Sequence, residues 1–281
     1  MNLTRMIVTP LAAGALVACG DGTGPGDGGT MTLKFTMAPG VAAGEAGLSL
    51  ARAAITALPL EGTNGTLTLD ETWLVVDKVE LTSVADTCGT DDDDDDDGEE
   101  SASRVALHDG WGDAGDDNDE NCEVALGPFF VSIPLEDEGS VEVTVDVVPG
   151  TYEEIELKTG APNDNEDADF LAQIREAFPD WPANASLLVV GSFRPTDGEA
   201  VPFRVYFKAR IEVEQEFEDD PLVVEEGGDL TVTVVIDPTP WFTNADGTVD
   251  DLSIYDFDAT GEVVDFGMRS REGCRIERDD D

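Results

Sequence analysis

Apolar and polar residues alternate along several stretches of this chain, and this period of two constrains the fold more than any other feature. Over residues 203–214 the odd positions are apolar and the even positions are mostly charged. Such alternation is typical of a strand with one face on a core and the other in water. Three further apolar faces alternate in this way: Leu33, Phe35 and Met37; Val141, Val143, Val145 and Val147; and Leu230, Val232, Val234 and Ile236.

Further patterns complete an all-β prediction. Strands are also expected at residues 72–84, 104–108, 123–135, 151–158 and 186–193. One helix is expected at 169–178, where apolar residues recur at helical spacing and Pro179 ends the run. The segment Val148-Pro149-Gly150-Thr151 predicts a type II turn between two neighbouring antiparallel strands. Together these favour an antiparallel β-sandwich with Greek-key connections, one short helix and long acidic loops.

The amino-terminal 18 residues have the pattern of an export signal. Arg5 is their only charge, and an apolar run extends from Met6 to Ala18. A helix over this run would reach about 20 Å, which is shorter than the roughly 30 Å of a bilayer's hydrocarbon core. The segment is therefore expected to be removed rather than to span a membrane.

The end of this segment, Leu16-Val17-Ala18-Cys19, resembles the lipobox of bacterial lipoproteins. The resemblance implies that Cys19 becomes the new amino terminus, carries a diacylglycerol thioether and is acylated on its amine. Several acyl chains together anchor a protein stably to a membrane. Gly20 stands where inner-membrane lipoproteins have a retaining aspartate, so the expected location is the cell envelope at the outer membrane. An ordinary secretory signal with a chance cysteine is the alternative.

The rest of the chain divides by composition. Residues 19–30 are predicted to be a flexible, Gly-rich tether, because no apolar residue follows Cys19 in this stretch. Residues 31–268 are predicted to form the β-sandwich domain, with an acidic insertion at 88–122, and residues 269–281 a charged tail. A boundary between two domains within residues 160–169 is the alternative to one domain with long loops.

The charge of the chain excludes some partners. The sequence has 63 acidic and 15 basic residues and a net charge of −48, so it repels nucleic acid and anionic lipid headgroups. A salt-adapted surface without specific metal sites would explain this charge, but it predicts acidic residues spread evenly. Many of them are clustered instead, which favours local cation binding.

Arg204, Lys208 and Arg210 share one strand face and are expected to pair with acidic neighbours; a clamp for an anionic ligand is the alternative.

Three acidic segments, 113–120, 163–169 and 244–250, combine oxygen-bearing side chains with glycine or alanine. Loops of this kind can supply the six to eight oxygen ligands that calcium takes, although none matches an EF-hand. The candidate calcium ligands are Asp113, Asp116, Asn118, Asp164, Asp167, Asn244 and Asp246. Plain acidic loops are the alternative. The aspartates at 91–97 are expected to be a solvated run.

Cys88 and Cys122 flank the aspartate run at 91–97 and the acidic segment at 113–120. Because an exported protein matures in an oxidising compartment, a disulfide between them is expected to clamp the base of this insertion. Cys274 would then remain, and its pairing with either of the other two stays open.

A second resemblance concerns the strands. Trp73 with Val79 and Leu81, followed by Val148-Pro149-Gly150-Thr151-Tyr152 running into Ile155 and Leu157, resembles a family of bacterial envelope lipoprotein domains of unassigned function. The likeness covers about half of the mature chain. It implies a sandwich fold and an envelope location, and it assigns no site residues.

Catalytic groups are scarce, so no catalytic residue is assigned and an enzyme is not expected. His108 is the only histidine, and no G-x-S-x-G motif occurs. The expected function is a lipid-anchored binding or structural module of the envelope, associated with calcium. Its expected partners are the membrane, through the anchor, and an envelope protein or glycan. The alternative is a carbohydrate-active enzyme that uses paired carboxylates.

Overall fold

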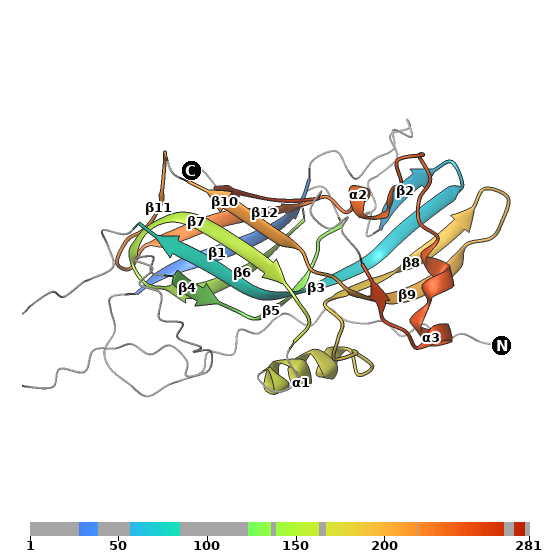
Figure 1. Cartoon of the computed structure of the whole chain (residues 1–281), viewed down its shortest axis with the longest axis horizontal. Helices are drawn as coiled ribbons and strands as arrows, with labels where there is room; N and C mark the ends of the chain where they lie inside the picture. Colours follow the sequence, from blue (N-terminus) through green and yellow to red (C-terminus); the bar gives the residue numbers. More distant parts are fainter. Residues whose placement is uncertain are drawn as a thin grey trace, which may run out of the picture.

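The computed structural model describes residues 28–38, 57–84, 123–135, 139–162, 167–217, 219–266 and 273–278. Strands dominate these residues and form two sheets (Figure 1). The all-β class predicted from the alternation is therefore confirmed. None of the helices in these ranges is both long enough and apolar enough to cross a bilayer.

The smaller sheet has the strand order β14-β12-β1-β6. Its strands are β1 (Gly29–Met37), β6 (Ser140–Val147), β12 (Asp229–Ile236) and β14 (Cys274–Arg278). The apolar faces predicted for β1 and β12 are buried in the main core. β1 is antiparallel to β6 but parallel to β12. The sheet is therefore mixed, and the wholly antiparallel arrangement that was expected does not hold for this pair.

The larger sheet is organised around the long strand β3 (Gly65–Ser83). Its first half pairs with β8 (Leu187–Pro195) and its second half with β7 (Gly150–Thr159). Three shorter strands also pair with β3: β2 (Leu58–Gly62), β4 (Glu123–Leu126) and β5 (Phe129–Ser132). β9 (Val201–Lys208) pairs with β8, and β10 (Glu212–Glu216) pairs with β7.

Two predicted strands are interrupted in the structure. Residues 203–214 form β9 and then β10, because the chain changes partner from β8 to β7 between them. At this crossing the Ala209 amide donates to Ser186 Oγ and the Ile211 amide to Thr159 Oγ1, both at 2.8 Å. The stretch 123–135 divides into β4 and β5 at Pro128, which has no N–H to donate to a ladder.

The turn at Pro149-Gly150 does not join neighbouring strands, and the prediction of a hairpin is wrong. β6 belongs to the smaller sheet and β7 to the larger, so this turn connects the two sheets. The Tyr152 hydroxyl donates to the Val148 carbonyl oxygen at 2.6 Å and closes the connection. Turn residues specify a local bend, but they do not specify which sheet each flanking strand joins.

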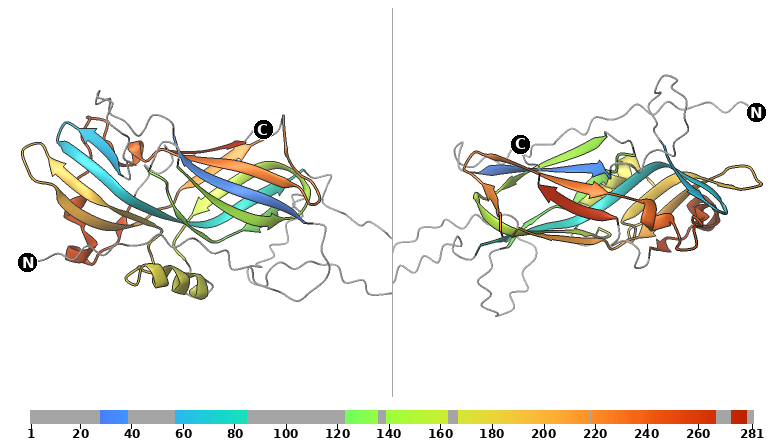
Figure 2. Two further views of the ribbon diagram at one scale, coloured as in Figure 1. Left: turned by 180° about the vertical axis from the view of Figure 1, so that it is seen from behind. Right: turned by 90° about the horizontal axis from the view of Figure 1, so that it is seen from above.

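The smaller sheet lies against part of the larger one (Figure 2), and the two share one buried cluster of apolar side chains. β1 and β12 contribute from the smaller sheet, and β3, β7 and β9 from the larger. The short strand β11 (Leu222–Val224) adds Leu222 and Val224. Ile276 of β14 is also buried there, so this part of the predicted charged tail is an edge strand.

A second core lies on the outer side of the larger sheet, beneath helix α1 (Ala168–Ala177). This helix begins and ends within one residue of its predicted limits. It buries Leu171 and Ile174 against Val75, Leu188 and the ring of Trp181. Tyr206, expected on an exposed strand face, is buried in this cluster instead, because residues inserted between β7 and β8 cover it.

The remaining elements follow β12 in the chain. They are α2 (Thr239–Phe242), the 3-10 helix η2 (Leu252–Tyr255), α3 (Phe257–Thr260) and β13 (Val264–Asp265). β13 is parallel to β9. Arg204 of β9 forms ion pairs with Asp258 of α3 and, at 3.8 Å, with Asp180. The expected acidic partners of Arg204 thus come from loops and a short helix rather than from adjacent strands.

Candidate functional site

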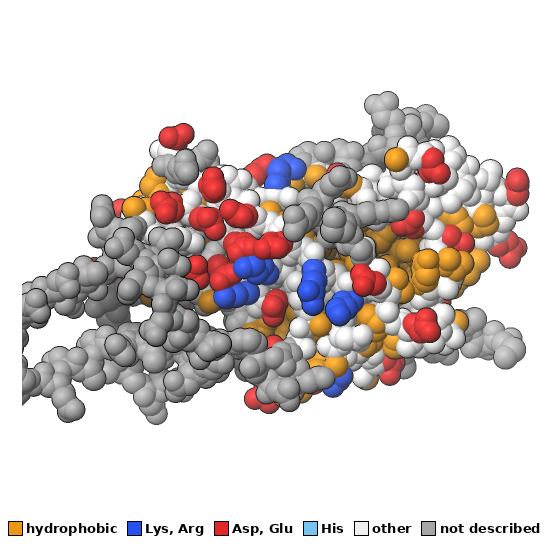
Figure 3. All heavy atoms as spheres, viewed as in Figure 1, with side chains coloured by type: hydrophobic (Ala, Val, Ile, Leu, Met, Phe, Trp, Pro, Cys, Tyr) orange, Lys and Arg blue, Asp and Glu red, His pale blue; other side chains and the backbone are white. Residues whose placement is uncertain are grey.

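Acidic side chains gather on the outer face of the larger sheet, over β7 and β10 (Figure 3). Glu214 of β10 lies opposite Glu156 of β7, which in turn lies opposite Glu80 of β3. In the next row, Glu216 lies opposite Glu154. We call these five residues the glutamate ladder. Like charges placed directly opposite one another destabilise a sheet, so this arrangement requires compensation.

The ladder follows from strand geometry. Side chains alternate between the two faces of a strand, and Ile155, Leu157 and Val213 occupy the core face of β7 and β10. The even-numbered glutamates must then project from the opposite face. Cross-strand register brings them into rows, and the register is set by burial of the apolar side chains on the other face.

Two lysines compensate part of the negative charge of the ladder. Lys158 Nζ lies 2.7 Å from Glu80 Oε2 and 2.7 Å from Glu156 Oε2, and Lys78 also pairs with Glu80. Burial alone would raise the pKa of Glu80, but the hydrogen bonds from Lys158 and Lys78 outweigh it and lower this pKa. The lysines thus hold the Glu80 carboxylate in its charged form.

The remaining three glutamates form a compact group, the glutamate triad of Glu154, Glu214 and Glu216. One carboxylate oxygen from each lies within 4.8 Å of the others, and no other such group of three is found among the described residues. Burial and the nearby charges of Glu214 and Glu216 raise the pKa of Glu154. Carboxylate oxygens are the ligands that calcium prefers, so the triad can bind a cation.

Several residues predicted to form sites lie outside the described ranges. They are Cys19, Cys88, Cys122, Asp113, Asp116, Asn118 and Asp164. Their proposed roles in lipidation, disulfide formation and calcium binding remain predictions. Asp167 lies at the start of α1, where its carbonyl oxygen accepts the Leu171 amide at 2.8 Å. Burial, and then the charge of Asp167, raise the pKa of Asp77.

The predicted calcium loop at 244–250 is closed by its own hydrogen bonds. Asn244 Nδ2 donates to Asp250 Oδ1 at 2.9 Å and to Thr248 Oγ1 at 3.1 Å. Asp246 Oδ1 accepts from the Thr248 hydroxyl and amide, which lowers the pKa of Asp246. Asn244 and Asp246 therefore both help to shape the turn, and their calcium-binding role stays a prediction.

The triad is not among the sites predicted from the sequence. Glu212 and Glu214 lie in the predicted strand at 203–214 and Glu154 and Glu156 in that at 151–158, whereas Glu216 lies just beyond the first of these. The sequence does not show that β7 and β10 are neighbouring strands. A search for pairs of predicted strands that both carry alternating acidic residues would have found this candidate.

Glu154→Gln is expected to stabilise the calcium-free protein at pH 7.5 by about 0.2 to 1 kcal/mol, because it removes like-charge repulsion and conserves side-chain size. The gain should shrink as the pH falls toward 4.5, the ordinary pKa of glutamate. Since the pKa of Glu154 is raised in the folded state, its protonation at lower pH removes the same like-charge repulsion from the wild type. Urea denaturation at both pH values measures the difference.

Glu199→Gln provides the matched control, because Glu199 is exposed outside the ladder. This control is expected to change stability by less than about 0.5 kcal/mol. Equal effects of the two substitutions, or a gain for Glu154→Gln that does not depend on pH, would contradict the repulsion within the triad.

Comparison with known proteins gives no independent assignment of this site. No family model matches the chain, and no match was found among the curated proteins or the solved structures.

Proposed function

We propose that this chain is a lipid-anchored module of the bacterial cell envelope that binds ligands without catalysis and carries calcium on its acidic surface. The lipobox-like segment ending at Cys19 and the Gly-rich tether after it support the anchor and the outer-membrane location. The observation that carries the calcium proposal is the glutamate triad, with three carboxylate oxygens within 4.8 Å of one another.

A cation bound at the triad would offset an electrostatic cost that the fold creates. Lys158 pairs with Glu80 and Glu156, and Lys78 pairs with Glu80. These two lysines of β3 and β7 therefore compensate the other two members of the ladder. The backbone of the sheet fixes the positions of Glu154, Glu214 and Glu216, so little chain entropy is lost when an ion binds. Calcium suits this arrangement better than magnesium, because it tolerates irregular geometry and completes its shell with water.

The proposed partners follow from the anchor and the charge. The membrane is contacted through lipid on Cys19, and the folded part is free to meet an envelope protein or a glycan. Nucleic acid is excluded by the net charge of −48. The acidic segment 113–120, which contains Asp113, Asp116 and Asn118, is a further candidate for calcium binding in this proposal.

Calcium is expected to raise the melting temperature of the purified protein beyond the effect of high sodium chloride. Monovalent salt screens the repulsion between surface carboxylates in general. A specific site adds a further term, about 2.7 kcal/mol when calcium is a hundredfold above its Kd. Melting curves in high sodium chloride, with millimolar calcium or millimolar magnesium, measure this term. Magnesium is expected to add less than calcium.

A Glu154→Gln/Glu214→Gln double variant locates the effect. If the triad binds calcium, the double variant loses a large part of the calcium-dependent gain and Glu199→Gln keeps all of it. A full gain in the double variant would place calcium elsewhere, and no gain in the wild type would favour a salt-adapted surface without specific sites.

A further inference from the structure

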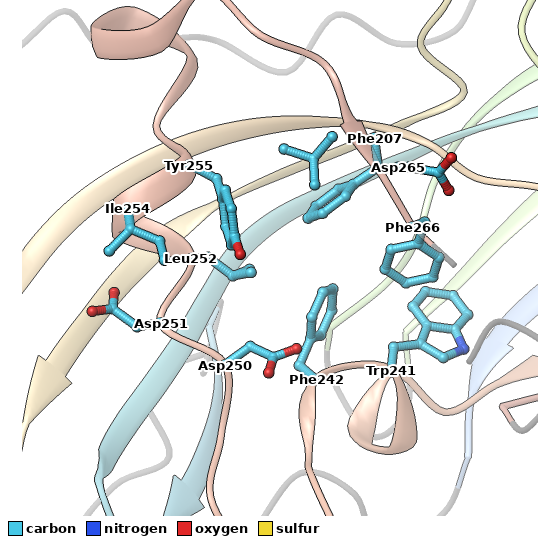
Figure 4. Close-up of a pocket in the computed structure, with 11 residues that line it drawn as sticks. Phe207, Trp241, Phe242, Asp250, Asp251, Leu252, Ile254, Tyr255, Asp265 and Phe266 are labelled. Carbon is cyan, nitrogen blue, oxygen red and sulfur yellow. The ribbon is translucent and has the colours of Figure 1, made fainter. Parts of the chain in front are cut away.

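A pocket of about 400 Å³ lies between β9, β13 and the chain that follows β12. Its residues come from different elements than the glutamate triad, so it is a separate feature of the molecule. Figure 4 shows an open space with Tyr255 on one side and Phe207 and Phe266 on the other. Its volume is at the small end of ligand pockets, which span roughly 300 to 1,000 Å³. Any ligand it takes must therefore be small.

The apolar part of the pocket is aromatic and already packed. The ring centres of Phe207 and Phe266 are 5.1 Å apart, and those of Phe242 and Phe266 are 5.8 Å apart. Phe207 and Phe242 are almost fully buried, and together with Leu252 they form a preformed apolar lining. Tyr255 is 43% exposed, so its ring is accessible at the mouth of the pocket.

The charged side chains of the pocket lining are all acidic. Asp250, Asp251 and Asp265 contribute to its lining, and none of the lining residues that the structure describes is lysine, arginine or histidine. The carboxylate of Asp250 points toward the ring of Phe242, and those of Asp251 and Asp265 lie at the outer sides (Figure 4). Asn244 Nδ2 donates to Asp250 Oδ1 at 2.9 Å and so fixes this carboxylate.

We propose that this pocket binds a small organic cation, an ammonium group carried on a compact apolar body. The accessible ring of Tyr255 attracts such a cation through the negative charge of its π-system. The carboxylate of Asp250, with those of Asp251 and Asp265 at the outer sides, adds Coulombic attraction. An inorganic ion would gain nothing from the apolar lining. An anion would be repelled both by the pocket and by the net charge of −48.

The test compares two probes of nearly the same shape. Choline carries a quaternary ammonium group, and 3,3-dimethyl-1-butanol has an uncharged carbon in its place. Isothermal titration of the purified protein, carried out in separate runs without and with calcium, is expected to show saturable binding of choline in the calcium-free run. The neutral analogue should bind at least about tenfold more weakly, as the loss of cation–π and carboxylate attraction implies.

Two variants tie the binding to this pocket. Tyr255→Ala removes the accessible ring and Asp250→Asn removes the inward carboxylate; each should weaken choline binding about tenfold. Asp197→Asn, in an exposed loop outside the pocket, is the control for the loss of one negative charge and should bind like the wild type. Melting temperatures verify that each variant is folded.

Three results would overturn the proposal. They are an absence of saturable choline binding, equal binding of the neutral analogue, and choline binding that Tyr255→Ala leaves unchanged in a folded protein. Tighter binding of an uncharged methyl glycoside than of choline would assign the pocket to sugars instead. Each of these outcomes is independent of whether calcium stabilises the protein.

Discussion

Trp181→Ala is expected to lower the free energy of unfolding by about 3 to 5 kcal/mol, because it leaves a large cavity beneath helix α1. Trp181 is 1% exposed. Its ring packs edge-to-face on Phe130 and Tyr206, with ring centres 5.1 and 5.3 Å apart. The indole N–H donates to the Ala185 carbonyl oxygen at 3.2 Å, so the substitution also removes a buried hydrogen bond.

The substitution is expected to reduce the local stability of α1 more than that of the rest of the fold. A helix of ten residues is marginal by itself, and Leu171 and Ile174 of α1 belong to the same buried cluster as Trp181. The Trp181 carbonyl oxygen also accepts a bond from Arg175 Nε at 3.1 Å. Amide hydrogen exchange in α1 should therefore accelerate in the variant more than exchange in β1 or β12.

Urea denaturation measures the total effect, and two further variants serve as controls. Trp181→Phe keeps most of the aromatic contact and should cost less than the alanine variant. Val223→Ala, at a position 51% exposed, should change stability by less than about 0.5 kcal/mol. A loss below about 1 kcal/mol for Trp181→Ala would show that this aromatic cluster is not needed to dock α1.

The second large effect concerns the anchor. Cys19→Ser is expected to abolish lipidation and leave the unprocessed precursor, because serine has no thiol to form the diacylglycerol thioether. Expression in a Gram-negative host, metabolic labelling with a fatty acid and partition into detergent would measure this. The wild type should be labelled and enter the detergent phase, and the variant should do neither.

Cys274→Ser is the matched control for this experiment. Cys274 is a free thiol in β14, and burial followed by the charge of Asp237 raises its pKa to about 12. It is therefore un-ionised at neutral pH and a poor nucleophile. Labelling should persist in Cys274→Ser. A Cys19→Ser protein that still partitions as a mature lipoprotein would show that the lipobox interpretation is wrong.

Local patterns determined several of the strands and which face of each of these is buried, but β2, β11 and β14 were not predicted, and the strand predicted at 104–108 lies outside the described residues. The apolar positions of β1 and β12 and the odd positions of residues 203–213 lie in the main core as predicted. Helix α1 was also predictable from local sequence, since its apolar residues at helical spacing and the Pro179 that ends them lie close together in the chain. These features depend on interactions within a few residues, which the sequence displays directly.

Only the tertiary structure decided which strands are neighbours. Pro149-Gly150 predicts a turn, yet β6 and β7 belong to different sheets, and β1 and β12 pair in parallel although about 190 residues separate them. Such pairings depend on how two apolar faces fit together, and many arrangements satisfy the same alternating pattern.

The candidate sites, too, were decided only by the tertiary structure. The sequence places Glu154 and Glu214 on predicted strand faces, and Glu216 follows the predicted strand at 203–214, but the proximity of the three depends on the register between β7 and β10. The pocket likewise joins Phe207 to Tyr255 and Phe266, which come together because the chain after β12 folds back over β9. Charge and aromatic character are properties of each residue, whereas a binding site requires long-range packing to bring these residues together.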